Sequence, residues 1–352
     1  MFKNKMKEPL VSVLIYNYNY GKYLRECFDS ALNQTYKNIE IIFSDNASTD
    51  NSWDIAVEYA KKYNEKITII RNRENFGSGS NLYNCYTKIR GKYYLVLCSD
   101  DILDKNFVQK TVNILEANHN TGYVITHRLI IDENSNKTYE APFYKHSCII
   151  PTAKQSEIYM MAGFNPSISQ VMYRYINDTN YSLFSYPIKS YTFRLKDFYL
   201  SLNYDVGYIK KPLLYHRLHS KNNSVNISKD LLEIIGPYVL LFQYKELAQI
   251  YKAQNVIDRF DSAILKNANL SLRYSANAIL KNDLKIAKRY FFLAGALDLD
   301  IIETKEYKLI KDFFDSGKKK QKDILSNLQN QKDFLYRTVS YDIPEGSIII
   351  DE

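Results

Sequence analysis

Two adjacent carboxylates, Asp100 and Asp101, follow an apolar run at residues 93–98 (YYLVLC) that is typical of a buried strand. Neighbouring carboxylates repel each other, which raises the pKa of one of them unless a cation compensates. Mg²⁺ and Mn²⁺ prefer oxygen ligands and often complete their shell with substrate phosphates and water. We therefore expect this pair to bind a divalent cation and a phosphate-bearing ligand. The alternative is a solvated turn in which Asp101 or Asp104 caps the next helix.

Other polar residues follow apolar runs in the same way. Tyr18 and Asn19 come after residues 11–16, Asp45 ends residues 39–45, and Arg71 lies at the end of residues 66–72. The carboxyl ends of parallel strands meet at one edge, where open α/β sheets bind ligands. There Asp45 could accept the N3–H of uracil or thymine, with Tyr18 stacked on the base. An Asx turn is the plainer interpretation of Asp45.

Further candidates lie downstream. Asp197, in LKDFYL, falls in a predicted helix and could serve as a general base, although an aspartate on a helix surface is commonplace. His216 and His219, in YHRLH, have the i, i+3 spacing of a metal-ligand pair, but a structural role is the simpler interpretation.

Strand-like and helix-like segments alternate through the first 131 residues. This alternation predicts an α/β fold with a mostly parallel sheet flanked by helices. The expected strands are residues 11–16, 39–45, 66–72, 92–98 and 123–131, and the expected helices are 22–34, 50–63, 79–90 and 104–117.

The pattern changes in the second half. Loops and short elements are expected from about residue 134, and helices dominate after about residue 228. We therefore predict two domains, residues 1–227 and 228–352, the second being helical with a short tail that ends in an edge strand.

Composition narrows the class of protein. The 352 residues include 47 Lys and Arg against 39 Asp and Glu, a net charge of +8 that is too small for a nucleic-acid-binding signature. The four scattered cysteines favour reduced thiols, and no signal peptide or membrane-spanning run is evident, so we expect a cytoplasmic protein. Neither G-x-G-x-x-G nor GxxxxGK[ST] occurs, which disfavours NAD chemistry and excludes a P-loop.

Two stretches carry a family resemblance. VSVLIYNYNYGKYLRECFDSALNQTYKNIEIIFSDNASTDNS and RNRENFGSGSNLYNCYTKIRGKYYLVLCSDD, continued by LKDFYLSL and KPLLYHRLHSKNNS, resemble the family 2 glycosyltransferases over about residues 8–225. The resemblance implies the GT-A fold, that of nucleotide-diphospho-sugar transferases. The sequence departs from the family pattern at Tyr16 and Ser44, and at Lys196, which stands where the family has a glutamate.

The resemblance implies a nucleotide pocket and a metal site. In the pocket, Tyr18 would stack on the base, Asn19 would line the site and Asp45 would accept from the base. Arg71 and Asn75 would lie near the nucleotide.

For the reacting groups, the resemblance implies that Asp100 approaches the ribose or sugar and that Asp101 binds the Mn²⁺ or Mg²⁺ that bridges the diphosphate. Asp197 matches the catalytic base. His219 matches a histidine that touches the metal or the diphosphate in some members.

The expected activity is inverting transfer of a sugar from a nucleotide-diphosphate sugar, a UDP-sugar first of all. The acceptor would be a hydroxyl of a glycan or lipid-linked oligosaccharide in bacterial cell-surface polysaccharide synthesis. Residues 165–170 and the C-terminal helices would shape the acceptor site. Those helices could instead mediate self-association, and a peripheral membrane contact stays open. The alternatives are a non-catalytic nucleotide-sugar-binding partner, which Lys196 suggests, and a nucleotidyltransferase, which lacks support because no glycine-rich basic loop follows the first strand.

Overall fold

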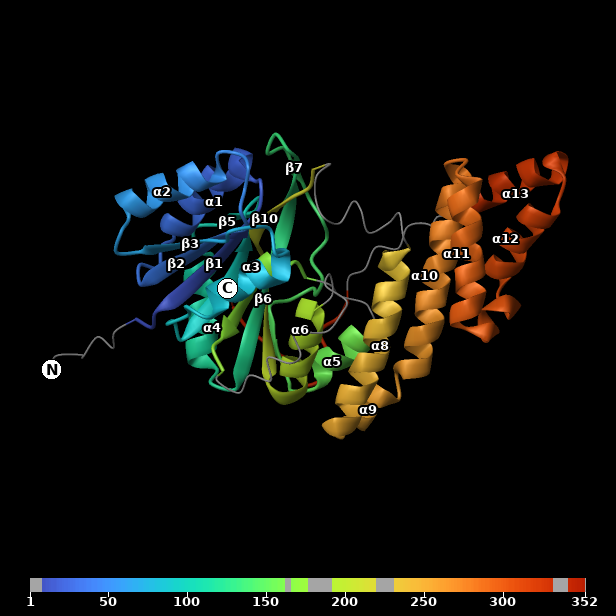
Figure 1. Ribbon diagram of the computed structural model, residues 1–352. Helices are drawn as coiled ribbons and strands as arrows, with labels where there is room; N and C mark the ends of the chain where they lie inside the picture. Colours follow the sequence, from blue (N-terminus) through green and yellow to red (C-terminus); the bar gives the residue numbers. More distant parts are fainter. Residues whose placement is uncertain (1–7, 162–165, 177–191, 220–230, 332–340, 352) are drawn as a thin grey trace.

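A sheet packed between helices forms the first part of the chain, and a run of helices follows it (Figure 1). The computed structural model describes residues 8–161, 166–176, 192–219, 231–331 and 341–351. The strands of the described chain are β1 (Val11–Asn17), β2 (Ile39–Asp45), β3 (Ile67–Arg71), β4 (Tyr93–Cys98), β5 (Ile102–Leu103), β6 (Thr121–Ile131), β7 (Lys137–Thr138), β8 (Cys148–Ile150), β9 (Val171–Arg174), β10 (Asp205–Arg217) and β11 (Ile348–Ile349). The α-helices are α1 (Gly21–Leu32), α2 (Ser52–Lys62), α3 (Ser78–Tyr86), α4 (Phe107–Ala117), α5 (Lys154–Met160), α6 (Thr192–Asn203), α8 (Leu232–Ile250), α9 (Gln254–Ile257), α10 (Phe260–Leu280), α11 (Leu284–Leu297), α12 (Lys305–Asp315) and α13 (Lys318–Asn330).

The sheet has the order β11-β8-β10-β6-β9-β4-β1-β2-β3, with β5 also paired to β10 and β7 to β6. Strands β4, β1, β2 and β3 are parallel neighbours, and β6 and β10 form a second parallel pair. Between these two groups lies β9, which is antiparallel to both β4 and β6. The predicted mostly parallel α/β sheet is therefore confirmed, and the five strands expected in the first 131 residues are all present.

The central strands are covered on both faces, which explains why their sequences are apolar at nearly every position. On one face, alternate residues of β1 and β4 such as Val13 and Leu95 pack against α1, α2 and α4. On the other face, residues such as Leu14 and Val96 pack with α3, α5 and α6. Because side chains alternate along a strand, Tyr94, Val96 and Cys98 share this second face.

The C-terminal helices continue the second face before leaving it. Residues of α8, α9 and the beginning of α10, including Tyr244 and Val256, belong to the same hydrophobic core as β4 and α6. From Ala268 onward, α10 to α13 enclose a separate core and extend away from the sheet (Figure 1). The predicted domain boundary at residues 227 and 228 lies outside the described residues.

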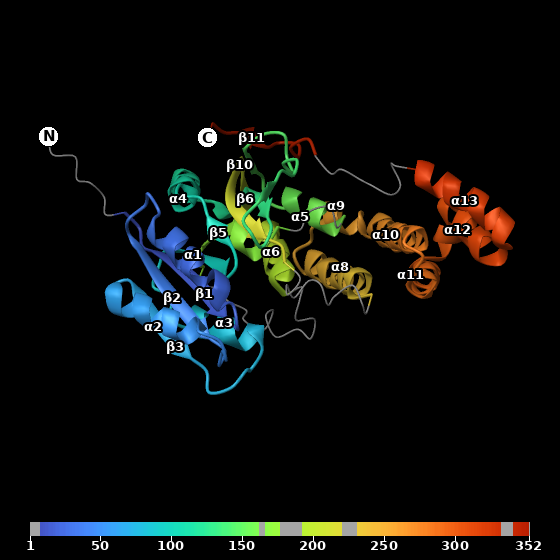
Figure 2. The ribbon, with the colours of Figure 1, turned by 90° about the horizontal axis from the view of Figure 1, so that it is seen from above.

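The end of the chain returns to the sheet. Strand β11 pairs antiparallel with β8, with Ile348 opposite Ile149, and so forms the sheet edge near the C-terminus (Figure 2). This agrees with the edge strand expected for the tail. No helix of the part that the structure describes is long and apolar enough to cross a membrane.

Candidate active site

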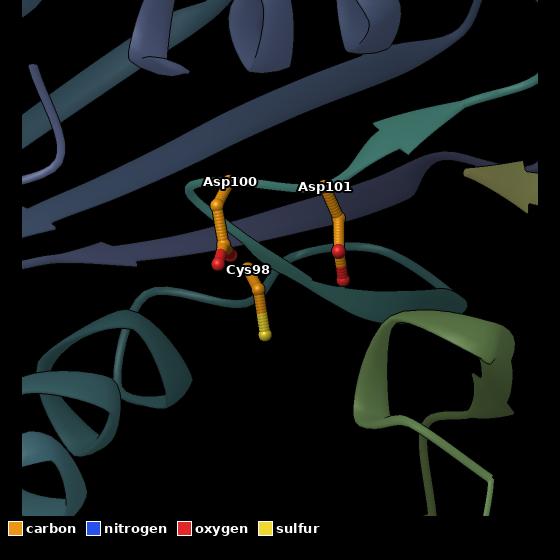
Figure 3. Close-up of side chains that lie close together, drawn as sticks. All are labelled: Cys98, Asp100 and Asp101. Carbon is orange, nitrogen blue, oxygen red and sulfur yellow. The ribbon is translucent and has the colours of Figure 1, made fainter. Parts of the chain in front are cut away.

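The Asp100–Asp101 pair lies where β4 ends, as its position in the sequence predicts. A turn follows Cys98, closed by the hydrogen bond that Asp101 N donates to the Cys98 carbonyl oxygen at 3.0 Å. Figure 3 shows the side chains of Cys98, Asp100 and Asp101 gathered at this turn. Immediately afterwards β5 pairs with Leu214 and Tyr215 of β10, so the end of β10 lies beside the two aspartates.

Strand β10 holds one carboxylate oxygen of Asp101. The His216 Nδ1 atom lies 3.0 Å from Asp101 Oδ1, and the Arg217 backbone N–H donates to the same oxygen at 3.0 Å. The second oxygen, Oδ2, is buried and has no hydrogen-bond partner among the described residues. A buried charged oxygen without a partner is costly, so a ligand is the natural complement of this atom.

Asp100 is also buried, although less completely than Asp101, and it has different partners. His219 Nε2 lies 3.2 Å from Asp100 Oδ2, and the His219 ring stacks on Tyr23 with centroids 5.1 Å apart. Burial and then the neighbouring charge of Asp101 raise the pKa of Asp100 to about 7. The mutual repulsion expected from the sequence is therefore present, and it is secondary to burial.

Arg217 fixes the backbone around the pair. Its guanidinium is almost wholly buried and donates to the carbonyl oxygens of Asp100 and Asp132 at 3.0 Å each, and to Glu26 Oε2 at 2.6 Å. The face of the guanidinium lies 4.7 Å from the Tyr23 ring centroid. One buried cation thus connects β10, the turn after β4 and α1.

The donor atoms at the turn suit a hard divalent cation. Ligand atoms of Cys98, Asp100 and Asp101 lie within 4.8 Å of one another. Burial raises the pKa of the Cys98 thiol, so the carboxylate oxygens are the anionic ligands here. Oxygen ligands and the unpartnered Oδ2 of Asp101 fit Mg²⁺ or Mn²⁺. His219 contacts Asp100, while His216, which the sequence presented as one of a histidine pair, contacts Asp101.

Asp45 stands at the end of β2 and is fully buried. Its Oδ2 accepts the Ser48 N–H at 3.0 Å, its Oδ1 accepts from Asn17 Nδ2 at 3.1 Å, and Arg71 Nε lies 3.6 Å from Oδ2. Asp45 thus accepts a local backbone N–H three residues on, whereas an Asx turn would use the N–H two residues on. Arg71 extends onward over Trp53, with the guanidinium carbon 5.0 Å from the ring centroid.

The other predicted nucleotide residues line the loops around Asp45. Asn19 has a positive φ of 59°, and its side-chain oxygen accepts the Thr49 N–H at 2.8 Å. Asn75 accepts from Asn46 Nδ2 at 2.6 Å, and Asn46 directly follows Asp45. Tyr18 is 41% exposed, so its ring is free to stack on a planar ligand. These residues form a polar edge along the ends of β1, β2 and β3.

Asp197 lies apart from the aspartate pair, on α6. It is buried, and Tyr173 of β9 donates its hydroxyl to Asp197 Oδ1 at 2.7 Å. Tyr173 is paired with Tyr94, four residues before Cys98 on the same face of β4. At about 3.3 Å per residue, roughly 13 Å of strand separates Tyr94 from Cys98. Burial raises the pKa of Asp197 to about 6, and the charge of Lys196 opposes that rise.

The structure thus brings together Asp100, Asp101 and His219, and separately Asp45, Arg71, Asn19 and Asn75, with Asp197 further along one face.

Sequence reasoning missed Arg217, although its place between His216 and His219 was a usable signal. It also did not place Cys98, one of the four cysteines expected to be reduced thiols, at the site. Of the acceptor loop expected at residues 165–170, Asn165 lies outside the described residues. Ser169 of the same loop contacts β4, because its hydroxyl oxygen accepts the Cys98 N–H at 3.0 Å.

Comparison with known sequences gives consistent matches. The sequence model described as Glycosyl transferase family 2 matches residues 12–204. An uncharacterised glycosyltransferase of Rickettsia prowazekii is 37% identical over 157 residues, which is 44% of this chain and 45% of the relative. The glycosyltransferase GlyG of Streptococcus pneumoniae is 32% identical over 162 residues, 45% of this chain and 53% of that protein. The chain thus spans about half the length of these curated relatives.

Solved structures show a similar fold. TarS residues 1–349 of S. aureus, crystallised in complex with UDP-GlcNAc, aligns with a TM-score of 0.54 and 16% identity, covering 87% of this chain and 91% of that one. A second crystal structure of the same TarS fragment aligns with a TM-score of 0.51 and 17% identity over the same shares of the two chains. At this level of identity the likeness extends to the fold, including the helices after the sheet.

Proposed function

Since the chain belongs to glycosyl transferase family 2, we propose that it transfers a sugar from a nucleotide-diphosphate sugar to a hydroxyl group of an acceptor, with inversion at the anomeric carbon. The observation that carries this proposal is the Asp100–Asp101 pair at the end of β4, with one buried oxygen of Asp101 unpartnered in the described chain. The donor's diphosphate and a divalent cation together complement that site.

We assign Asp101 and Asp100 to the cation, with His219 beside them. When bound, a divalent cation neutralises charge on the departing diphosphate. The protein's own contribution is to hold the two carboxylates in place through His216, Arg217 and His219. The buried surroundings also exclude water, which strengthens electrostatic interactions within the site.

Asp197 is the proposed general base. An acceptor hydroxyl would attack the anomeric carbon, forming a new carbon–oxygen bond while the bond to the diphosphate breaks and its electron pair leaves with the phosphate oxygen. The hydroxyl proton would pass to Asp197, whose Oδ1 is held by Tyr173. A carboxylate with a pKa of about 6 is a stronger base than an ordinary aspartate and is still ionised at neutral pH.

A UDP-sugar is the proposed donor. Support comes from the fold-related TarS structure, which was solved with UDP-GlcNAc, and from the polar edge at Asp45, Arg71 and the exposed Tyr18. A glycan or lipid-linked saccharide, in cell-surface polysaccharide synthesis, is the proposed acceptor class. The C-terminal helices would contribute to its site or to self-association.

A donor screen tests this function. Purified protein with Mn²⁺ would be incubated with UDP-, dTDP- and GDP-sugars, and release of the nucleoside diphosphate would be measured without and with saccharide acceptors. We expect one donor to be hydrolysed slowly and to turn over faster when an acceptor is present. Donor binding with no release under any condition would favour the non-catalytic binding partner, the alternative that the Lys–Asp pair at residues 196–197 raises.

A further inference from the structure

Lys196, the residue before the proposed base, is buried in a cage of tyrosine rings. Only 5% of the residue is exposed. Its Nζ atom lies 3.2 Å from the ring centroid of Tyr173 on β9, 5.3 Å from that of Tyr94 on β4 and 6.0 Å from that of Tyr86 on α3. Each distance lies within or at the limit of a cation–π contact, and such contacts are strongest where water is excluded.

Tyr173 connects this cation to the base. The face of its ring receives Lys196 Nζ, and its hydroxyl donates to Asp197 Oδ1 at 2.7 Å. Lys196 Nζ also lies 3.4 Å from the Tyr94 hydroxyl oxygen, which fixes the ammonium between two rings. A cation over the ring withdraws electron density from the phenol and makes its hydroxyl a better donor to a carboxylate.

The other groups around Asp197 cannot replace this charge. Tyr123 donates its hydroxyl to the Asp197 backbone carbonyl oxygen, not to the carboxylate. Besides Lys196, the only cationic group with a resolved effect on the pKa of Asp197 among the described residues is Arg194, whose effect is the smallest of its causes. Among the described residues, the ionisable groups that interact with Asp197 are Lys196 and Arg194 on α6 itself, and Tyr123, Tyr159, Tyr173 and Tyr244 from the elements packed against it.

Both members of the Lys196–Asp197 pair are costly to bury alone. An isolated buried charge is disfavoured, and a buried carboxyl group then takes up a proton. In that protonated form Asp197 could not accept a proton from an acceptor. The glutamate that the family resemblance places at position 196 would add a second negative charge here. This chain has a lysine instead, and although burial lowers the pKa of Lys196 to about 7, the lysine is still charged at the pH where Asp197 titrates.

We propose that Lys196 is a positioning residue that keeps Asp197 in its carboxylate form, both by its own charge and by holding Tyr173 as a hydrogen-bond donor. The inference rests on the proposed role of Asp197 as the base. It accounts for the charge reversal at position 196, because a lysine within the tyrosine cage would stabilise the charged form of the proposed base.

Infrared titration of the protein without ligands tests the coupling independently of turnover. The Asp197 carboxyl band is identified as the band that Asp197→Asn removes, and its pH midpoint is followed in wild type, Lys196→Met and Tyr173→Phe. We expect Lys196→Met to raise the midpoint by about 1 to 3 pH units, because it removes an opposite charge near the carboxylate. Tyr173→Phe should raise it too. Circular dichroism establishes that each variant is folded.

The control is Lys245→Met, which removes a lysine that lies 4.0 Å from the Phe260 ring centroid and so has a similar cation–π contact elsewhere. It should leave the Asp197 midpoint unchanged. A folded Lys196→Met protein with the wild-type midpoint would overturn the proposal and reduce Lys196 to a packing residue. Should Lys196→Met fail to fold, Tyr173→Phe and Lys196→Arg decide the matter: the proposal requires a raised midpoint in the first and a midpoint near wild type in the second.

Kinetics separate this inference from the proposed function. If Asp197 is the base, the acidic limb of the kcat/KM profile should move with the infrared midpoint in Lys196→Met, while the KM for the donor stays near its wild-type value. A shifted infrared midpoint with an unshifted kinetic limb would support the Lys196–Asp197 coupling and refute the base assignment. An unshifted infrared midpoint refutes the coupling whatever the kinetics show.

Discussion

At the scale of single residues, the site contains two kinds of buried carboxylate. Asp101 has one oxygen held by His216 and the Arg217 backbone, and another with no partner in the described chain. Asp197 is held by the Tyr173 hydroxyl and flanked by Lys196. Leaving a buried polar group unpaired costs about 1–3 kcal/mol or more when it is charged. The unpaired oxygen of Asp101 therefore lowers the stability of the protein without a ligand and suits a ligand. The Asp197 carboxylate, in contrast, suits the proposed role of accepting a proton.

Replacing Asp197 by Asn should abolish most turnover while donor affinity is retained. General-base catalysis contributes about 10²- to 10⁴-fold, so kcat should fall by that factor. Steady-state kinetics and calorimetric donor binding measure the two quantities. The control is Asp205→Asn, which changes an aspartate that binds the Thr152 N–H at the start of β10, and it should leave kcat near wild type. Unchanged kcat in Asp197→Asn would refute the base assignment.

The pH dependence follows from the raised pKa of Asp197. Because burial raises it from 3.8 to about 6, Asp197 is protonated and inactive as a base below pH 6 and ionised above it. We expect kcat/KM to rise with pH through an apparent pKa near 6. The residual activity of Asp197→Asn should lack this rise. A wild-type limb near pH 4 would indicate an ordinary, solvated carboxylate as the base.

Single residues differ in how far the sequence predicts them. Asp45 and the Asp100–Asp101 pair were predictable because the end of a parallel strand fixes where a residue lies. The environment of Lys196 was not, since its cage joins Tyr86, Tyr94 and Tyr173 from three elements. Nothing in local sequence distinguishes these tyrosines from others among the 32 in the chain.

At the scale of elements, α6 is positioned by the first C-terminal helix as well as by the sheet. Phe198 of α6 and Tyr244 of α8 stack with centroids 3.9 Å apart and an interplanar angle of 8°. The Tyr244 hydroxyl also donates to the Arg194 carbonyl oxygen at 3.2 Å. Since α6 carries Asp197, the placement of the proposed base depends on α8.

Truncating Phe198 to Ala should destabilise the protein and lower kcat together. Loss of a fully buried aromatic ring costs about 3–5 kcal/mol through lost burial and the cavity left behind. Denaturant unfolding gives the free energy, and kcat is measured where both proteins are folded. The control is Phe242→Ala on α8, which removes a ring that is 48% exposed and should change both quantities much less. Equal effects of the two substitutions would contradict this account of α6.

The sequence predicts some strands of the sheet but not all of them. Strand and helix alternation predicted β1 to β4 and β6 within a few residues. Strand β9, only Val171–Arg174, falls where the sequence predicts loops and short elements without identifying a strand, and it lies antiparallel between β4 and β6. Four residues provide too little periodicity to mark a strand, so its pairing depends on tertiary contacts that local sequence does not reveal.

At the scale of the whole molecule, the described chain has a core on each face of the sheet and a separate one within the distal helices. The distal core runs from Ala268 to Leu328 and includes Leu272, which is fully buried on α10. We predict that Leu272→Ala costs about 2–5 kcal/mol in unfolding of the helical part while leaving nucleotide affinity unchanged. Calorimetric unfolding and ligand titration test this, with Phe292→Ala, 67% exposed, as the control. Loss of nucleotide binding in a folded Leu272→Ala protein would show that the distal helices support the donor site.

The central claim is that Asp101 and a divalent cation bind the donor's diphosphate. Isothermal titration of UDP, dTDP and GDP into wild type, with and without Mn²⁺, tests it most directly when repeated on Asp101→Asn. The control is Asp104→Asn, which changes a carboxylate that accepts the Asn106 N–H two residues further on. The account predicts metal-dependent binding of one nucleotide in wild type and in Asp104→Asn, weakened at least about tenfold in Asp101→Asn, which is about 1.4 kcal/mol. Binding that is independent of the metal and intact in Asp101→Asn, or no binding of any nucleotide by the folded protein, would contradict it.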